Sequence, residues 1–304
     1  MGTKAKKPVN KIRVLFILFC VAFPVLNFLV FYVYVNLSSF GMAFTDRTGA
    51  FSLNNFVRVF REFTSPDGTL RLALCNTLLT FAIQLIMYPF QVLVSFFIYK
   101  KIPFAGIYRI LFFLPSILAG VVVSMVFTRM VGPTGFIAEL VQKIGNLDYV
   151  PELLSDSRFA NITVFAHMVW LSFPGDLVIW GGTFSRIPEE VLESGKIDGT
   201  TWWTEFTRII VPMVWPTISL QMVLKFCGIF GASGAVFLLT GGEYGTVTLS
   251  VWQYLELLHN SGSAYNSNAY NYLSAAGMVL TVVAVGISLS VRKLADKFFD
   301  EMEF

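Results

Sequence analysis

Six stretches of this chain are long and apolar enough, or nearly so, to cross a lipid bilayer as helices, and this feature constrains the fold most strongly. A spanning helix needs about 20 predominantly apolar residues. Charged residues make up only 13% of the 304 residues, whereas a soluble domain has about a quarter. We therefore predict an all-α membrane protein, a polytopic bundle of six transmembrane helices. The predicted spans are Val14–Val35, Leu72–Tyr99, Ile110–Thr128, Ile162–Trp180, Ile209–Leu239 and Tyr272–Val291.

The distribution of Lys and Arg predicts how these spans are oriented. Basic residues favour the cytoplasmic side of a membrane. With both termini inside, 14 of the 22 basic residues fall in cytoplasmic segments and seven in outer segments. The first span follows Lys4, Lys6, Lys7, Lys11 and Arg13, but its apolar run is too long for a signal peptide and no cleavage pattern follows it. We predict a multi-pass protein with cytoplasmic termini, in which the first span is an anchor.

The remaining composition excludes several classes of function. The net charge of +3 is too small and too dispersed to indicate nucleic-acid binding. The chain has no G-x4-G-K-[S/T] motif, so it offers no phosphate-cradling loop for a nucleotide. Cys20, Cys75 and Cys227 all lie in apolar runs, without C-x-x-C spacing. We expect no cofactor and no metal site. A membrane-embedded enzyme is excluded because the spans hold no cluster of His, Cys and carboxylate residues.

The segment between the fourth and fifth spans, on the predicted cytoplasmic side, reads IPEEVLESGKIDGTTWWTEFTRIIVPMVWP. Pro188 suits the first position of a helix, which would run to about Lys196. Asp198-Gly199 is a turn signal, because glycine adopts positive φ without strain. A second short helix would follow from about Thr200. The aromatic residues at the bend have two explanations, an interfacial belt at the membrane surface or a docking element for a partner protein.

The same segment resembles the cytoplasmic signature of binding-protein-dependent ABC importer permeases, E-A-A-x3-G-x9-I-x-L-P. Glu193, Gly199, Ile209 and Pro212 fall on the signature without a gap, and Asp198 and Phe206 match two further positions that are common in the family. The departures are Ser194 and Gly195 for the two alanines, Thr200 for the alanine after the glycine, and Val211 for leucine. Residues 111–127 and 236–256 resemble segments of sugar-type permeases of the maltose and glycerol-phosphate branch. The resemblance covers roughly residues 70–291.

This resemblance implies a type I ABC importer permease fold in a bacterial cytoplasmic (inner) membrane. It implies residues 70–291 as the permease domain, with a coupling loop at 186–212, flanked by 1–69 and 292–304. The implied partners are a second permease subunit, forming a heterodimer, a cytoplasmic ABC ATPase dimer that hydrolyses the ATP, and an extracellular or periplasmic solute-binding protein that delivers a carbohydrate.

The resemblance also implies roles for individual residues of the loop. Glu193 would be the polar contact to the ATPase, and Asp198-Gly199 would supply the bend. Ile197, Trp202 and Phe206 would form the apolar surface that enters a cleft on the ATPase, and Pro212 would begin the fifth span and transmit its tilt.

Two charged residues inside the spans are candidates for the transport path. Asp176 and Lys225 flank the coupling loop on either side, and a charge at mid-membrane usually faces a cavity or a partner. Two arrangements remain open. The two residues pair with each other for structural reasons, or they line the path together with Trp170, whose ring would stack on a sugar.

Two alternatives to a sugar permease also remain open. Within the same family, the substrate would be glycerol phosphate or another polyol derivative. In another class, the chain would be a secondary transporter, which requires ion-coupling carboxylates and an inverted repeat. Asp176 alone gives that alternative little support.

Overall fold

The computed structural model describes residues 11–46, 48–66, 68–100, 102–146, 148–261 and 267–300, so Lys4, Lys6 and Lys7 of the basic tail lie outside the described residues. This part of the chain is helical, with one isolated bridge between Thr45 and Phe51. Five helices are long and apolar enough to cross a membrane, and a bent pair makes a sixth if it is counted as one span. The predicted polytopic helical fold is confirmed. The chain divides into two compact units, Met1–Phe60 with Asn260–Val279, and Arg61–His259 with Leu280–Phe304.

The first unit carries the predicted anchor. Its helical run comprises α1 (Lys11–Asn27), a π-helical segment η1 (Phe28–Tyr34) and α2 (Val35–Ala43). None of its most apolar window is buried within the chain. After α2, the chain is held by amide side chains, because Asn55 on α3 (Asn54–Thr64) donates to the carbonyls of Ala43 and Thr45.

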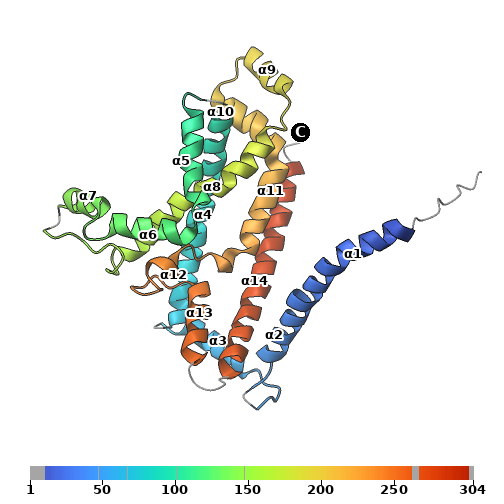
Figure 1. Cartoon of the computed structure of the whole chain (residues 1–304), viewed down its shortest axis with the longest axis vertical. Helices are drawn as coiled ribbons and strands as arrows, with labels where there is room; N and C mark the ends of the chain where they lie inside the picture. The colour runs from blue at the N-terminus through green and yellow to red at the C-terminus, as the bar shows by residue number, and fades with distance from the viewer. Residues whose placement is uncertain are drawn as a thin grey trace, which may run out of the picture. The chain divides into compact units, whose positions relative to one another are not determined.

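The second unit is built around two long parallel helices, α4 (Thr69–Tyr99) and α8 (Ala160–Phe184), whose C-terminal ends lie together (Figure 1). Their contact is aromatic, with Tyr88 and Phe96 of α4 against Trp180 and Phe184 of α8. These four side chains are almost completely buried, and burial of large aromatic surface is the main stabilising contribution that such a contact makes. Between Tyr88 and Phe96, the side-chain amide of Gln91 donates a hydrogen bond to the backbone carbonyl of Ser172 on α8, at 3.1 Å.

The predicted third span is not one continuous helix. It consists of α5 (Ala105–Ile117) and α6 (Gly120–Val131), which meet at an angle of 106°. Pro115 removes a backbone donor near the end of α5, and Leu118 is in an extended conformation, with φ −80° and ψ 148°. After the bend, α6 packs against α7 (Phe136–Gly145) through Phe127, Val131 and Ala138.

The predicted fifth span is also shorter than expected. The helix α11 (Val211–Cys227) ends at Gly228 and is followed by a 3-10 turn η3 (Ile229–Gly231) and a short α12 (Val236–Leu239). Gly234 has φ +53°, and a Cβ atom there would overlap the side chain of Met168. Gly228, Gly231 and Gly234 are spaced by three, as in a small-residue face for helix packing, but in the structure they lie at and after the end of α11.

The chain after α12 returns to α4 before the last helices. Asn76 of α4 donates to the carbonyls of Gly245 and Val247, at 2.7 and 2.8 Å, and the amide of Leu249 donates to the Thr77 hydroxyl. This contact positions the start of α13 (Leu249–Ser261). The last helix, α14 (Ser267–Asp300), extends beyond the predicted sixth span at both ends.

Candidate functional site

The predicted hairpin between the fourth and fifth spans is present in the structure (Figure 1). Its first helix is α9 (Glu189–Ile197) and its second begins with α10 (Trp202–Glu205). Pro188 lies one residue before α9, at the N-cap, rather than at the first helical position. The α9 helix ends at Ile197, and the bend follows at Gly199, whose φ is +71°, as predicted.

The bend at Gly199 is a Schellman motif. The amide of Gly199 donates to the carbonyl of Lys196, and the amide of Thr200 donates to the carbonyl of Gly195, at 3.1 and 3.0 Å. The Thr200 hydroxyl also donates to the Gly195 carbonyl, at 2.8 Å. Gly195 is buried, and a Cβ atom there would lie 2.9 Å from Cδ1 of Ile209. The departures from the family signature at 195 and 200 therefore contact each other at the bend.

The second half of the hairpin continues without interruption into the fifth span. Thr201 caps α10, since its hydroxyl accepts from the amide of Thr204. A π-helical turn, η2 (Phe206–Ile210), then leads into α11. Pro212 follows this turn and lacks the amide that would bond to the Arg208 carbonyl in a regular α-helix. The backbone is thus helical without a break from α10 through η2 into α11.

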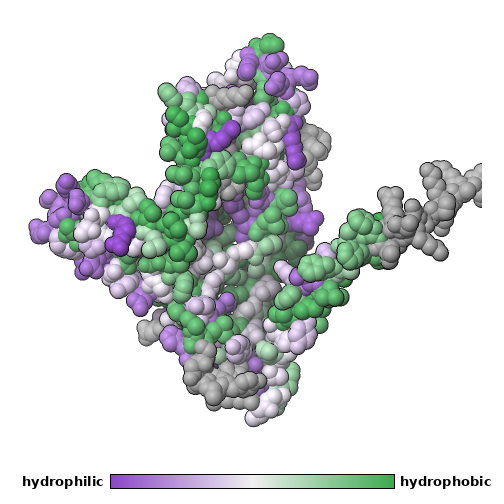
Figure 2. Space-filling view, viewed as in Figure 1, coloured by the Kyte–Doolittle hydropathy of each residue, from purple (hydrophilic) through white to green (hydrophobic). Residues whose placement is uncertain are grey.

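The tip of the hairpin is exposed and partly apolar. Ile197 is 85% exposed, and Trp202 and Trp203 are about half exposed. Glu193 and Asp198 are also exposed. Figure 2 shows mostly hydrophilic residues over α9 and hydrophobic ones over α5. The sequence-based role of Phe206 has to be corrected, because this side chain is buried in the core with Phe96 and is not available to a partner.

The hairpin is fixed to the end of α4 by contacts that the sequence analysis missed. Glu205 of α10 is 3% exposed and forms an ion pair with Lys100, the residue that follows α4. Beside this pair, Trp202 packs on Phe97, with ring centroids 5.4 Å apart. Burying a carboxylate is costly unless it is paired. The available sequence signal for this contact was Glu205, a carboxylate among aromatic residues, but the sequence does not show that its partner is Lys100.

A cavity of about 460 Å³ lies between α4, α8, α11 and the break after α11. Asp176 and Lys225 both line it, and their side chains pair at 3.3 Å. Of the two predicted arrangements, the structure therefore has the pair. Trp170 is not among the lining residues and instead stacks on Phe127, with centroids 6.0 Å apart. The ring faces α6 and is 40% exposed, and its place in the transport path stays a prediction.

The other polar residues of this cavity come from three different helices. They are Gln84 and Gln91 of α4, Ser124 of α6, and His167 and Ser172 of α8. Gly120 and Gly234 also line the cavity, so the two helix breaks that the sequence did not reveal contribute to its wall. Within the described part of the chain, Gln91 Oε1, Ser124 Oγ and both ring nitrogens of His167 are buried without a hydrogen-bond partner. Such atoms are uncommon in folded proteins and need an explanation.

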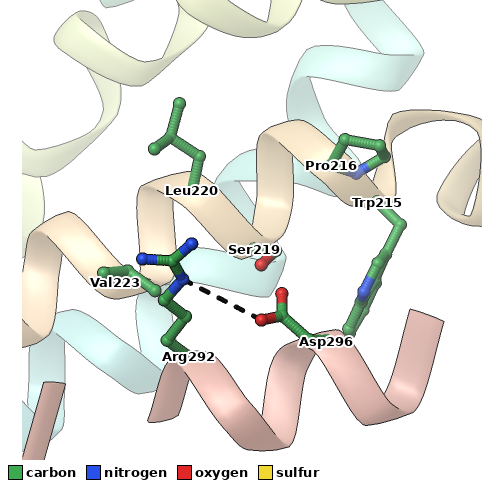
Figure 3. Close-up of a pocket in the computed structure, with 7 residues that line it drawn as sticks. All are labelled: Trp215, Pro216, Ser219, Leu220, Val223, Arg292 and Asp296. Atoms are coloured by element: carbon green, nitrogen blue, oxygen red, sulfur yellow. Dashed lines mark ion pairs between the residues drawn. The ribbon is translucent and has the colours of Figure 1, made fainter. Parts of the chain in front are cut away.

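A second cavity, of about 590 Å³, lies between α11 and the end of α14 (Figure 3). Trp215 and Val223 of α11 lie toward the ion pair of Arg292 and Asp296 on α14, whose charged atoms are 3.9 Å apart. Leu220 also lines the cavity. The Trp215 ring nitrogen donates to the carbonyl of Ala295, at 3.2 Å. The beginning of α11, which follows the hairpin, and the C-terminal end of α14 therefore lie side by side.

Residues 74–300 match the model of a protein family described as "binding-protein-dependent transport system inner membrane component". The chain is 25% identical to the multiple sugar-binding transport system permease protein MsmF of Streptococcus mutans, over 90% of this chain and 93% of that protein. It is 26% identical to the arabinooligosaccharides transport system permease protein AraP of Bacillus subtilis, over 91% of this chain and 87% of that protein.

A solved structure also has the same fold. This is a chain of a bacterial alginate ABC transporter in complex with an alginate pentasaccharide-bound periplasmic protein. The TM-score is 0.78 at 22% identity, and the alignment covers 95% of this chain and 97% of the other.

Proposed function

Because this chain belongs to the family of binding-protein-dependent transport system inner membrane components, we propose that it is one of two permease subunits of an ATP-driven importer. The second permease would complete the path, and a binding protein outside would deliver the substrate. ATP would be hydrolysed on a separate pair of cytoplasmic subunits. The hairpin would lie in the cytoplasm, and so would both termini.

The observation that carries this proposal is the hairpin itself. Its exposed tip presents Ile197 beside Glu193 and Asp198, while its second helix is packed against α4. An exposed apolar side chain on a well-supported helix is typical of a protein–protein contact. ATP-driven movement of the ATPase subunits would displace the hairpin, and the continuous connection into α11 would carry that displacement to the cavity wall at Lys225.

The substrate class follows from the relatives rather than from the fold. MsmF and AraP are described as permeases for sugars and arabinooligosaccharides. We infer a carbohydrate, in the size range of an oligosaccharide, that passes the cavity containing Asp176 and Lys225. The individual relatives differ in substrate, so the family alone does not decide between a neutral and an acidic compound.

The contact with the ATPase is tested by placing a charge at the hairpin tip. Ile197→Asp is expected to lower the amount of ATPase that co-purifies with the tagged chain at least tenfold, because truncation or charging of an apolar contact residue at an interface costs about 2 kcal/mol or more. Purification from host membranes and quantitative mass spectrometry measure this ratio. Ile144→Asp is the matched control, since Ile144 is equally exposed, at 83%, but lies on α7.

Two outcomes would contradict the proposal. If both variants retain the ATPase at the level of the unmodified chain, the hairpin is not its contact. If no ATPase co-purifies with the unmodified chain and the purified chain alone carries solute across a vesicle membrane, it is a secondary transporter.

A further inference from the structure

The cavity at Asp176 and Lys225 carries no uncompensated charge. Among the described residues that line it, Lys225 is the only Lys or Arg and Asp176 is the only carboxylate. The Lys225 ammonium group pairs with Asp176 at 3.3 Å and lies 5.0 Å from the centre of the Tyr88 ring. Its positive charge is therefore satisfied by an anion on one side and an aromatic face on another.

An anionic substrate would meet an unfavourable environment here. To bind a phosphate or a uronate, Lys225 would have to leave Asp176, whose side chain is only 15% exposed. The carboxylate would then remain without a cation in a largely desolvated position, which is costly. A substrate without charge leaves the pair intact.

The unpartnered polar atoms around the cavity indicate what such a substrate would offer. Gln91 contributes an acceptor, Ser124 a hydroxyl that both donates and accepts, and His167 two ring nitrogens. Hydroxyl groups satisfy all of these, because each hydroxyl donates one hydrogen bond and accepts others. Gln91, Ser124 and His167 come from α4, α6 and α8 and all line the cavity. The unpartnered atoms are buried in this conformation, so one ligand between the helices would contact them once the helices around the cavity separate.

We propose that this subunit's share of the transport path takes an uncharged polyhydroxy compound, a neutral sugar or polyol, and disfavours acidic oligosaccharides and sugar or polyol phosphates. The proposal rests on the function proposed above. The residues that set this preference are the Asp176–Lys225 pair, which neutralises the cavity, and Gln91, Ser124 and His167, which hydrogen-bond to hydroxyl groups.

The first test compares ligands in proteoliposomes that contain the complete importer and its cognate binding protein. The probes are maltotriose, raffinose, arabinotriose and sorbitol as neutral compounds, and trigalacturonate and glycerol 3-phosphate as anions. At least one neutral probe is expected to stimulate ATP hydrolysis fivefold or more, and neither anion is expected to exceed a fifth of that effect. Stimulation by an anion, or by none of the neutral probes in a complex that hydrolyses ATP, would overturn the proposal. Absence of an ATPase from the purified complex would instead refute the proposed function.

The second test distinguishes two roles for Lys225. In one, Lys225 and Asp176 neutralise each other; in the other, Lys225 is the counterion of an anionic substrate. Lys225→Met and Asp176→Asn each leave one charge unpaired, and each is expected to lower uptake of the best probe at least tenfold. The double variant D176N/K225M removes both charges. Its uptake of the same probe is expected to be at least five times that of either single variant. If Lys225 instead binds an anion, the double variant will transport as poorly as Lys225→Met, and the proposal is wrong. Full uptake by both single variants would refute it equally.

Discussion

Gly199→Val is expected to reduce transport by the assembled importer at least tenfold while the chain still inserts into the membrane. Gly199 has φ +71°, a conformation that β-branched residues rarely adopt. No atom lies within 4 Å of the position that a Cβ would take, so the effect is conformational rather than a steric clash. Valine at 199 would break the Schellman motif and reorient α9 relative to α10. Uptake per assembled complex, with ATP hydrolysis measured in parallel, checks this expectation.

Gly199→Asn is the matched control. Asparagine is also larger than glycine, but it adopts the left-handed conformation more readily than other non-glycine residues. The Asn variant should therefore keep most of the transport that the Val variant loses. Equal transport by both variants and the unmodified chain would show that the bend does not couple the ATPase to the membrane helices.

Lys100→Met is expected to have the second large effect. The substitution leaves Glu205 with no cation at a position that is 3% exposed, and breaking a buried ion pair on one side costs about 3–5 kcal/mol. We expect a clear fall in the melting temperature of the purified complex and loss of the ATPase from it, because the hairpin loses its attachment to α4. Thermal unfolding in detergent and co-purification measure the two effects.

Two further variants test the physical reason. K100M/E205M removes both charges and should recover most of the lost stability, because apolar replacement of a buried pair is often nearly neutral. Arg292→Met breaks an ion pair whose side chains are 68% and 64% exposed, and its cost should stay below about 1 kcal/mol. If Lys100→Met and Arg292→Met change the melting temperature equally, the Lys100–Glu205 pair does not hold the hairpin.

Much of the fold was predictable because lipid imposes simple requirements on a sequence. Long apolar runs identify α4 and α8, since every backbone group in the bilayer core must be hydrogen-bonded within its own segment. The hairpin was predictable from local signals alone. Pro188, Asp198 and Gly199 have conformational preferences that do not depend on distant residues.

The two helix breaks were not predictable in the same way. Leu118 and Ala119 leave the helix between α5 and α6, yet both are as apolar as their neighbours, so hydropathy does not change there. The glycines after Cys227 were visible, but glycine serves both close helix packing and helix termination. Only the contact of Gly234 with Met168 decides between the two.

The candidate site was predictable to the extent that it is local. Ile197 and Gly199 lie where the signature places them, whereas the burial of Phe206 depends on Phe96, more than one hundred residues earlier in the chain. His167 and Trp170 are three positions apart on α8 and share an edge-to-face contact, but only His167 lines the cavity. The neighbours of α8 decide which residue faces the cavity, and the sequence of α8 does not contain that information.

The most direct test of the proposed coupling is a photo-crosslinking experiment in intact cells, with benzoylphenylalanine placed at position 197 or, as the control, at position 144. Both positions carry highly exposed isoleucines, on α9 and α7 respectively. We predict that position 197 crosslinks to the ATPase subunit and that position 144 does not. A crosslink from position 197 to an extracellular binding protein, or to lipid with no ATPase adduct, would contradict the proposed role of the hairpin.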